Sequence, residues 1–122
     1  MARYRLSDPA EVDLAGILRA SETRHGVEAR IRYRGLLTAA MRRVATSPLG
    51  VSSLDRGELS AGLRSLHIGR ARNESREAPV AEPVHVVFYR AIEPGLVEIV
   101  RVLHERMEPS RHVGEGGAND GS

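Results

Sequence analysis

The side chains with the most reactive chemistry lie near the C-terminus. His104 and His112 are eight residues apart, with Glu105 and Glu108 between them. Imidazole and carboxylate groups bind zinc, but a stable site needs a third ligand on a rigid element, and this segment supplies none. We therefore predict no metal site. The chain also has no phosphate-binding loop, dinucleotide fingerprint, zinc-protease motif or serine-hydrolase motif, so no cofactor is expected.

Arginine is the second informative residue type. All 18 basic residues are Arg, which excludes lysine chemistry and favours bidentate contacts to carboxylate or phosphate. Arg64 and Arg70 lie an even number of residues apart in a predicted strand, so their side chains point to the same face. Arg90 and Arg101 likewise share one face of a predicted hairpin. Such a face is either solvated or a cationic surface for a phosphate backbone or an acidic protein. With three Tyr and one Phe, the chain alone is not expected to read a nucleic-acid sequence.

Length and composition describe one small domain. The 122 residues bury a modest core, and the lack of cysteine excludes disulfides and thiolate zinc sites. No stretch approaches the roughly 18 apolar residues of a membrane span, and no signal region is visible. We therefore expect a cytoplasmic protein without a membrane partner. Residues 1–113 are expected to form the domain, and residues 114–122 a disordered tail.

Two helices that could position these groups are predicted in the first half of the chain. After a short strand at Tyr4–Leu6, Asp8 can cap a helix that has Pro9 in its first turn. Gly26 ends that helix, and a second one follows over residues 27–46. So short a joint predicts an antiparallel helical hairpin, whose second helix has a basic outer face.

Three further strands are predicted in the second half, at residues 62–70, 85–92 and 97–103. Residues 71–83 are polar and read as an extended connection or a disordered loop. A type II turn at Pro94-Gly95 sets the register of the last hairpin. It pairs Ile92 with Val97, Arg90 with Ile99, Phe88 with Arg101 and Val86 with Leu103. The order β-α-α-β-β-β predicts an α+β fold, with the helical hairpin packed on a small antiparallel sheet through Val87, Tyr89, Ala91, Val100 and Val102.

The last hairpin and its tail carry a family resemblance. Residues 84–112, VHVVFYRAIEPGLVEIVRVLHERMEPSRH, resemble the close of ParE proteins, in which an FYR strand leads to RVLHxRMDxxRH. Residues 62–70 and the opening Tyr4-Arg5-Leu6-Ser7 also resemble the RelE/ParE toxin superfamily, so the resemblance spans about residues 3–112. It implies the fold read above. Members usually have a shorter connection than the one at 71–83.

The resemblance implies the toxin of a type II toxin–antitoxin system, which inhibits DNA gyrase and is neutralised by a ParD-like antitoxin. The alternative is a ribosome-dependent mRNA endonuclease like RelE. The nuclease branch carries a basic residue at the position of Val86 and basic and tyrosine groups in its tail. Here only His104 could act as an acid or base, because Arg remains protonated. We therefore favour gyrase and predict no catalytic residue. A third alternative is a non-toxic adaptor or RNA-binding module.

Two sets of binding residues are predicted on this basis. The antitoxin is expected at the helical hairpin, through apolar anchors and the basic face. Its candidates are Leu14, Leu18, Arg30, Arg34, Leu37, Met41 and Arg42, although most of the apolar members could instead be core. The target is expected at the sheet arginines and the C-terminal segment, with Met107 either a contact or a plug at the sheet edge. Its candidates are Arg64, Arg70, Arg90, Arg101, His104, Arg106, Met107 and Arg111.

Overall fold

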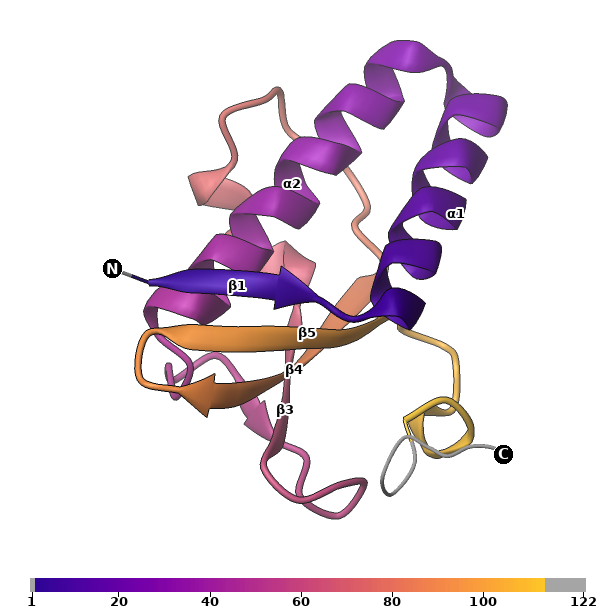
Figure 1. Cartoon of the computed structure of the whole chain (residues 1–122). Coiled ribbons are helices and arrows are strands. Elements are labelled where there is room, and N and C mark those ends of the chain that lie inside the picture. Colours follow the sequence, from indigo (N-terminus) through magenta and orange to yellow (C-terminus); the bar gives the residue numbers. More distant parts are fainter. Residues whose placement is uncertain (1, 114–122) are drawn as a thin grey trace.

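A helical hairpin covers one face of a five-stranded sheet, and the C-terminal segment turns back under the other face (Figure 1). The structure, a computed structural model, describes residues 2–113; the tail predicted at 114–122 lies outside them. The predicted α+β fold and its element order are confirmed, with a two-residue strand added. The elements are β1 (Arg3–Leu6), α1 (Asp8–His25), α2 (Val27–Thr46), β2 (Leu54–Asp55), β3 (Leu63–His67), η1 (Ile68–Glu74), β4 (His85–Glu93), β5 (Leu96–His104) and η2 (Pro109–Arg111).

The helical hairpin forms as predicted, with Gly26 alone between its helices. Gly26 has a φ of 94°, which glycine adopts without a steric penalty, and its N–H donates to the carbonyl of Glu22. At the other end Ser7, rather than the predicted Asp8, is the N-cap of α1. Its Oγ accepts from the N–H of Ala10 at 3.1 Å and donates to the carbonyl of Val100 at 2.7 Å. The cap therefore also ties α1 to the sheet.

The sheet has the order β1-β5-β4-β3-β2. Three of its four pairings are antiparallel, but β1 runs parallel to β5. The sheet is thus mixed, whereas the sequence predicts an antiparallel one. No tight turn connects β1 to β5, so their direction is set by where the helical hairpin returns the chain, and a local pattern does not report it.

Two irregularities, a bulge at Val100 of β5 and one between Ala91 and Glu93 of β4, change the register of the last hairpin between them. The pairs Phe88–Arg101 and Val86–Leu103 are as predicted, but beyond the bulge Tyr89 faces Ile99, Arg90 faces Glu98 and Ala91 faces Val97. The predicted pairs Arg90–Ile99 and Ile92–Val97 are therefore wrong. Because the extra residue reverses the alternation, Ile99 packs in the core under the helices, and Val100 packs on the opposite face.

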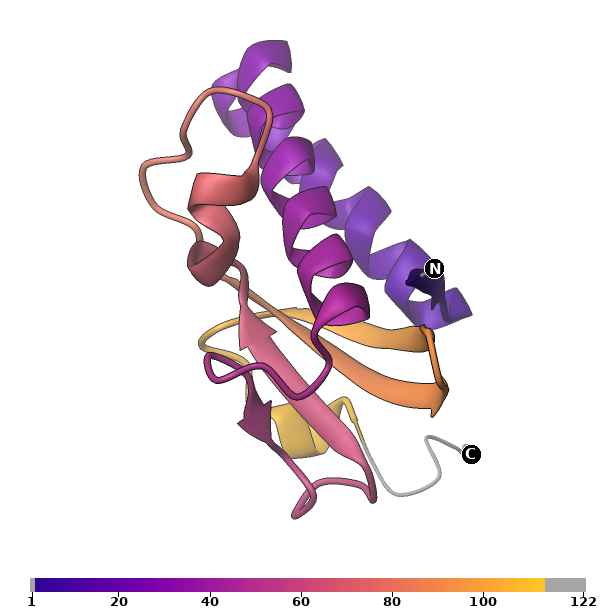
Figure 2. The same cartoon turned by 90° about the vertical axis from the view of Figure 1, so that its left-hand side faces the viewer.

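The chain leaves the sheet earlier than predicted after β3. The strand ends at His67, so Arg70 lies on η1 rather than on a strand. Residues 75–84 then pass beside α2 on their way to β4 (Figure 2). Gly35 of α2 lies under this connection, where a Cβ would come within 2.5 Å of Cγ of Glu77. The glycine costs α2 about 1 kcal/mol relative to alanine, and it allows this close approach.

Each face of the sheet carries a buried core. Under the helices, Tyr33, Leu37 and Val44 of α2 pack with strand residues that include Val87 and Tyr89. On the other face a smaller core consists of Leu63, Phe88, Leu103 and Val113. The sequence predicts this face as an arginine-rich surface. None of the helices in residues 2–113 combines the length and apolar composition that crossing a bilayer requires.

Candidate functional site

Arg101 is held by α1 rather than displayed on the sheet. Its guanidinium donates to both carboxylate oxygens of Asp13, at 2.8 and 2.9 Å, and to the carbonyl of His112 at 3.1 Å. Asp13 also accepts from the N–H of Val102 at 2.9 Å, at the part of β5 that β1 does not reach. The hydrogen bonds to Asp13 raise the pKa of Arg101 above its usual value. Asp13 thus satisfies a strand edge and neutralises a predicted target residue.

The other predicted sheet arginines lie elsewhere. Arg64 donates to Oγ of Ser53 at 2.8 Å, and Arg90 donates to Oγ of Ser60 at 2.6 Å. Arg70 is exposed on η1. The predicted cluster of Arg90 with Arg101 is therefore not formed, because one side chain reaches the turn before β3 and the other reaches α1.

The C-terminal segment after β5 brings the remaining target candidates together. His104 is half-buried at the end of the strand, and its carbonyl accepts from the N–H of Met107 in a tight turn. Met107 is 46% exposed, so it does not plug the sheet edge. Val113, by contrast, is 4% exposed and packs in the small core on the face of the sheet. Arg106 and Arg111 are also exposed, which leaves a short protruding surface with two cations and one flexible apolar side chain.

His104 has an imidazole neighbour that sequence reasoning missed. The ring of His85 lies edge-on to it, with centroids 5.5 Å apart. Nδ1 of His85 is 2.6 Å from the hydroxyl of Tyr33, which in turn accepts from the N–H of Val84. Burial, reinforced by His104, lowers the pKa of His85 to about 4, and burial raises the pKa of Tyr33. The predicted pair Val86–Leu103 already places His85 opposite His104, so this signal was present in the sequence.

A histidine–glutamate pair, His67 and Glu105, lies at the same end of the sheet. Nε2 of His67 is 2.7 Å from Oε1 of Glu105, and Nδ1 of His67 accepts from the N–H of Gly69 at 3.0 Å. Both imidazole nitrogens are therefore engaged. The bond to His67 lowers the pKa of Glu105. Residues 2–113 contain no group of three or more His, Asp and Glu arranged to hold a metal ion.

The predicted antitoxin residues divide by burial. Leu37 and Met41 are 1% and 5% exposed in the core, so they do not belong to the surface of the free chain. Leu14 and Leu18 are half-buried against that core. Arg30 is exposed and pairs with Glu22 at 2.8 Å. The last two members of the predicted set, Arg34 and Arg42 of α2, are exposed and line the same pocket.

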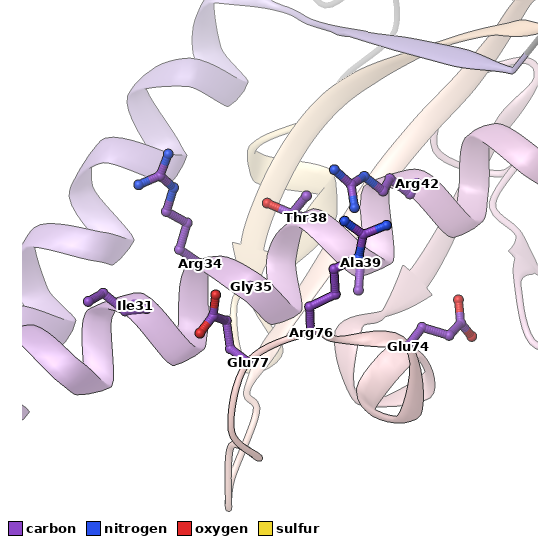
Figure 3. Close-up of a pocket in the computed structure, with 9 residues that line it drawn as sticks. All are labelled: Ile31, Arg34, Gly35, Thr38, Ala39, Arg42, Glu74, Arg76 and Glu77. Carbon is purple, nitrogen blue, oxygen red and sulfur yellow. The ribbon is translucent and has the colours of Figure 1, made fainter.

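This α2 pocket has a volume of about 280 Å³ and lies between α2 and the chain that follows η1 (Figure 3). On α2, Arg34 and Arg42 flank Thr38, at the four-residue spacing that places side chains on one helix face. Arg42 and Arg76 extend toward the same end of the pocket from opposite walls, while Glu74 points away (Figure 3). Its lining consists of Ile31, Arg34, Gly35, Thr38, Ala39, Arg42, Glu74, Arg76 and Glu77.

A second hollow, of about 720 Å³, lies between the loop after α2 and the β4–β5 turn. Pro48, Leu49, Ile92 and Leu96 give it a mostly apolar lining, and Arg64 contributes a polar side chain. Leu49 is 77% exposed. Arg64 is thus the one predicted target residue that lines this hollow.

Comparison with known proteins gives one consistent result. The family model described as "ParE toxin of type II toxin-antitoxin system, parDE" matches residues 4–109. A Caulobacter vibrioides protein named Toxin ParE1 is 38% identical over 115 residues, which cover 93% of this chain and 100% of the relative. A Mycobacterium tuberculosis protein of the same name is 31% identical over 112 residues, covering 92% and 98%.

Proposed function

Because the chain belongs to the ParE toxin family of type II toxin–antitoxin systems, we propose that it arrests growth by binding DNA gyrase and that a ParD-like antitoxin neutralises it. The family predicted from residues 84–112 is confirmed. The gyrase target and the antitoxin's identity rest on the family resemblance, and the geometry described above supports binding rather than catalysis.

The observation that carries this proposal is the state of the sheet arginines. Arg64, Arg90 and Arg101 are each held by oxygen atoms of the chain itself. A nuclease needs free cations over the scissile phosphate, together with an acid and a base. Arginines already committed to the fold instead serve to position neighbouring segments.

The target surface we propose is the protruding segment that follows β5. Arg106, Met107 and Arg111 are exposed there, beside the half-buried His104. Arginine and methionine are both enriched in the buried centres of protein interfaces. In this view Arg101 positions the segment, through its hydrogen bond to the carbonyl of His112.

Purified toxin tests the proposal directly. It should inhibit the supercoiling activity of gyrase in proportion to its concentration, and the antitoxin encoded in the same gene pair should restore supercoiling. Intact supercoiling, together with growth arrest in cells, would reject gyrase as the target. Expression without any growth arrest would favour a non-toxic adaptor.

The pair His85–His104 favours a second candidate, cleavage of mRNA on the ribosome. Within residues 2–113 the Nε2 atoms of both rings have no hydrogen-bond partner. His85, with its pKa near 4, is neutral at pH 7, so it cannot act as the acid and is only a weak base. Replacing both histidines with alanine discriminates the two functions: the nuclease loses its toxicity, whereas a gyrase inhibitor keeps it.

A further inference from the structure

The α2 pocket carries an excess of positive charge that the chain itself does not compensate. Among residues 2–113, Arg34, Arg42 and Arg76 have no ion-pair partner and donate no hydrogen bond. Of the two carboxylates in the lining, Glu74 pairs with Arg43 at 2.9 Å, which leaves Glu77. The lining therefore contains three unpaired guanidinium groups and one unpaired carboxylate. A ligand that complements this pocket is anionic.

The floor of the pocket distinguishes between anionic ligands. Ile31 is 46% exposed at one end, and Gly35 and Ala39 continue the same helix stripe. An apolar stripe beside cations suits a peptide that has both apolar and acidic side chains. A phosphate backbone has no apolar side chain that could use Ile31 or the stripe beside it.

The pocket is held open by contacts of its own walls. Arg43 of α2 binds Glu74, Oγ of Ser52 and the carbonyl of Arg70, which anchors η1 to the helix. At the far end of the connection, the hydroxyl of Tyr33 accepts from the N–H of Val84 at 3.0 Å. A site built on such fixed walls loses little conformational entropy when a ligand binds.

We propose that the α2 pocket binds an acidic segment of the antitoxin, and that the connection at residues 75–84 thereby helps select the cognate antitoxin. This inference rests on the proposed function. Arg34 and Arg42 lie eight helical residues apart, roughly 12 Å along the axis. Carboxylates four residues apart on an extended segment span a similar distance, about 13 Å. One carboxylate would bind between Arg42 and Arg76, and the other at Arg34.

The test compares the double variant Arg42→Glu/Arg76→Glu with Arg19→Glu, an exposed arginine of α1 that lies outside the pocket. The antitoxin from the chain's own gene pair is titrated against each folded toxin at several salt concentrations. We expect the double variant to bind at least tenfold more weakly and with a smaller salt dependence, because two attractive charges become repulsive. Arg19→Glu should stay within about twofold of the parent chain.

A charge-swap scan then locates the contact. Each acidic residue of the antitoxin is changed to Arg and tested against Arg42→Glu; at least one change should restore binding. The inference is overturned if the double variant binds the antitoxin with the parent's affinity, or if no change in the scan restores binding. In either case the toxin and the antitoxin would still form a complex, but not through this pocket. Loss of duplex-DNA binding in the double variant, with antitoxin binding unchanged, overturns it in favour of a nucleic acid. Failure of the parent chain to bind the antitoxin rejects the proposed neutralisation itself.

Discussion

Asp13 illustrates how one side chain can hold three segments together. It is 13% exposed, pairs with Arg101 and accepts the N–H of Val102, while Arg101 holds the carbonyl of His112. Replacing Asp13 with Ala leaves the half-buried guanidinium of Arg101 without its carboxylate and the N–H of Val102 without an acceptor, which should lower the free energy of unfolding by about 2–4 kcal/mol. Urea denaturation measures this loss.

Arg5→Ala is the control for Asp13→Ala, because Arg5 is exposed and its ion pair with Glu98 is long, at 3.5 Å. It should change the free energy of unfolding by less than about 1 kcal/mol. Equal stability of the Asp13→Ala protein and the parent would contradict the bracing role assigned to this carboxylate.

His85 should make stability depend on pH in the acidic range. Its pKa is lowered from 6.5 to about 4 in the folded chain, so the unfolded chain binds the proton more readily between these values. The contribution of His85 to the free energy of unfolding is fully present above pH 6.5 and is lost as the pH falls toward 4. Because the ring is only partly buried, we expect a loss of about 1–2 kcal/mol.

Replacing His85 with Gln tests the pH dependence, because the Gln amide can still form a hydrogen bond with the hydroxyl of Tyr33. Thermal unfolding between pH 4 and 7 should show a shallower dependence in this variant than in the parent. His104 and Glu105 act on the same ring and are present in both proteins, so the difference between the two proteins isolates His85. Parallel pH profiles would show that His85 does not titrate as described.

At the scale of elements, the segment after β5 serves the fold as well as the surface. Val113 packs against the small core, so truncation after Leu103 would uncover Phe88 as well as remove the exposed arginines. Such a truncation confounds instability with lost binding. The double variant Arg106→Ala/Arg111→Ala separates the two effects, because both side chains are exposed.

We expect Arg106→Ala/Arg111→Ala to unfold at the parent's temperature and to inhibit gyrase at least thirtyfold more weakly, since truncating an interface arginine can cost 2 kcal/mol or more. Supercoiling assays measure the loss. Val113→Ala is the complementary variant: it should destabilise the small core but leave the exposed arginines in place. Full inhibition by the double alanine variant would move the target surface away from this segment.

At the scale of the whole molecule, the two proposed binding surfaces lie at opposite ends of the fold. The α2 pocket lies beside η1, and the target segment lies at η2 beyond the other face of the sheet (Figures 1 and 2). Changes at sites this far apart should act independently. Arg106→Ala/Arg111→Ala should therefore bind the antitoxin within twofold of the parent, while Arg42→Glu/Arg76→Glu should remain toxic and resist neutralisation. Growth assays with and without the antitoxin measure both outcomes, and a common loss would indicate one shared surface.

Local sequence patterns are enough to predict the helical hairpin, the last two strands and the family. Helical periodicity and the joint at Gly26 predict the hairpin, strand patterns predict the final ladder, and residues 84–112 identify the family. Each of these signals is contained within a few tens of residues. The pairs Phe88–Arg101 and Val86–Leu103 agree with the register counted from the turn because the shift at Val100 cancels an opposite shift between Ala91 and Glu93.

The directions of the arginine side chains depend on contacts between segments that lie far apart in the sequence. Asp13 and Arg101 are 88 residues apart, and no local pattern connects them. The bulge at Val100 reverses the alternation that the strand pattern assumes, so residues beyond it change their pairing. The α2 pocket exists because residues 75–77 fold back over Gly35, where a Cβ would come within 2.5 Å of Cγ of Glu77. Charges that share a face of a predicted element become a site only when the packing of distant segments decides which of them the chain itself neutralises.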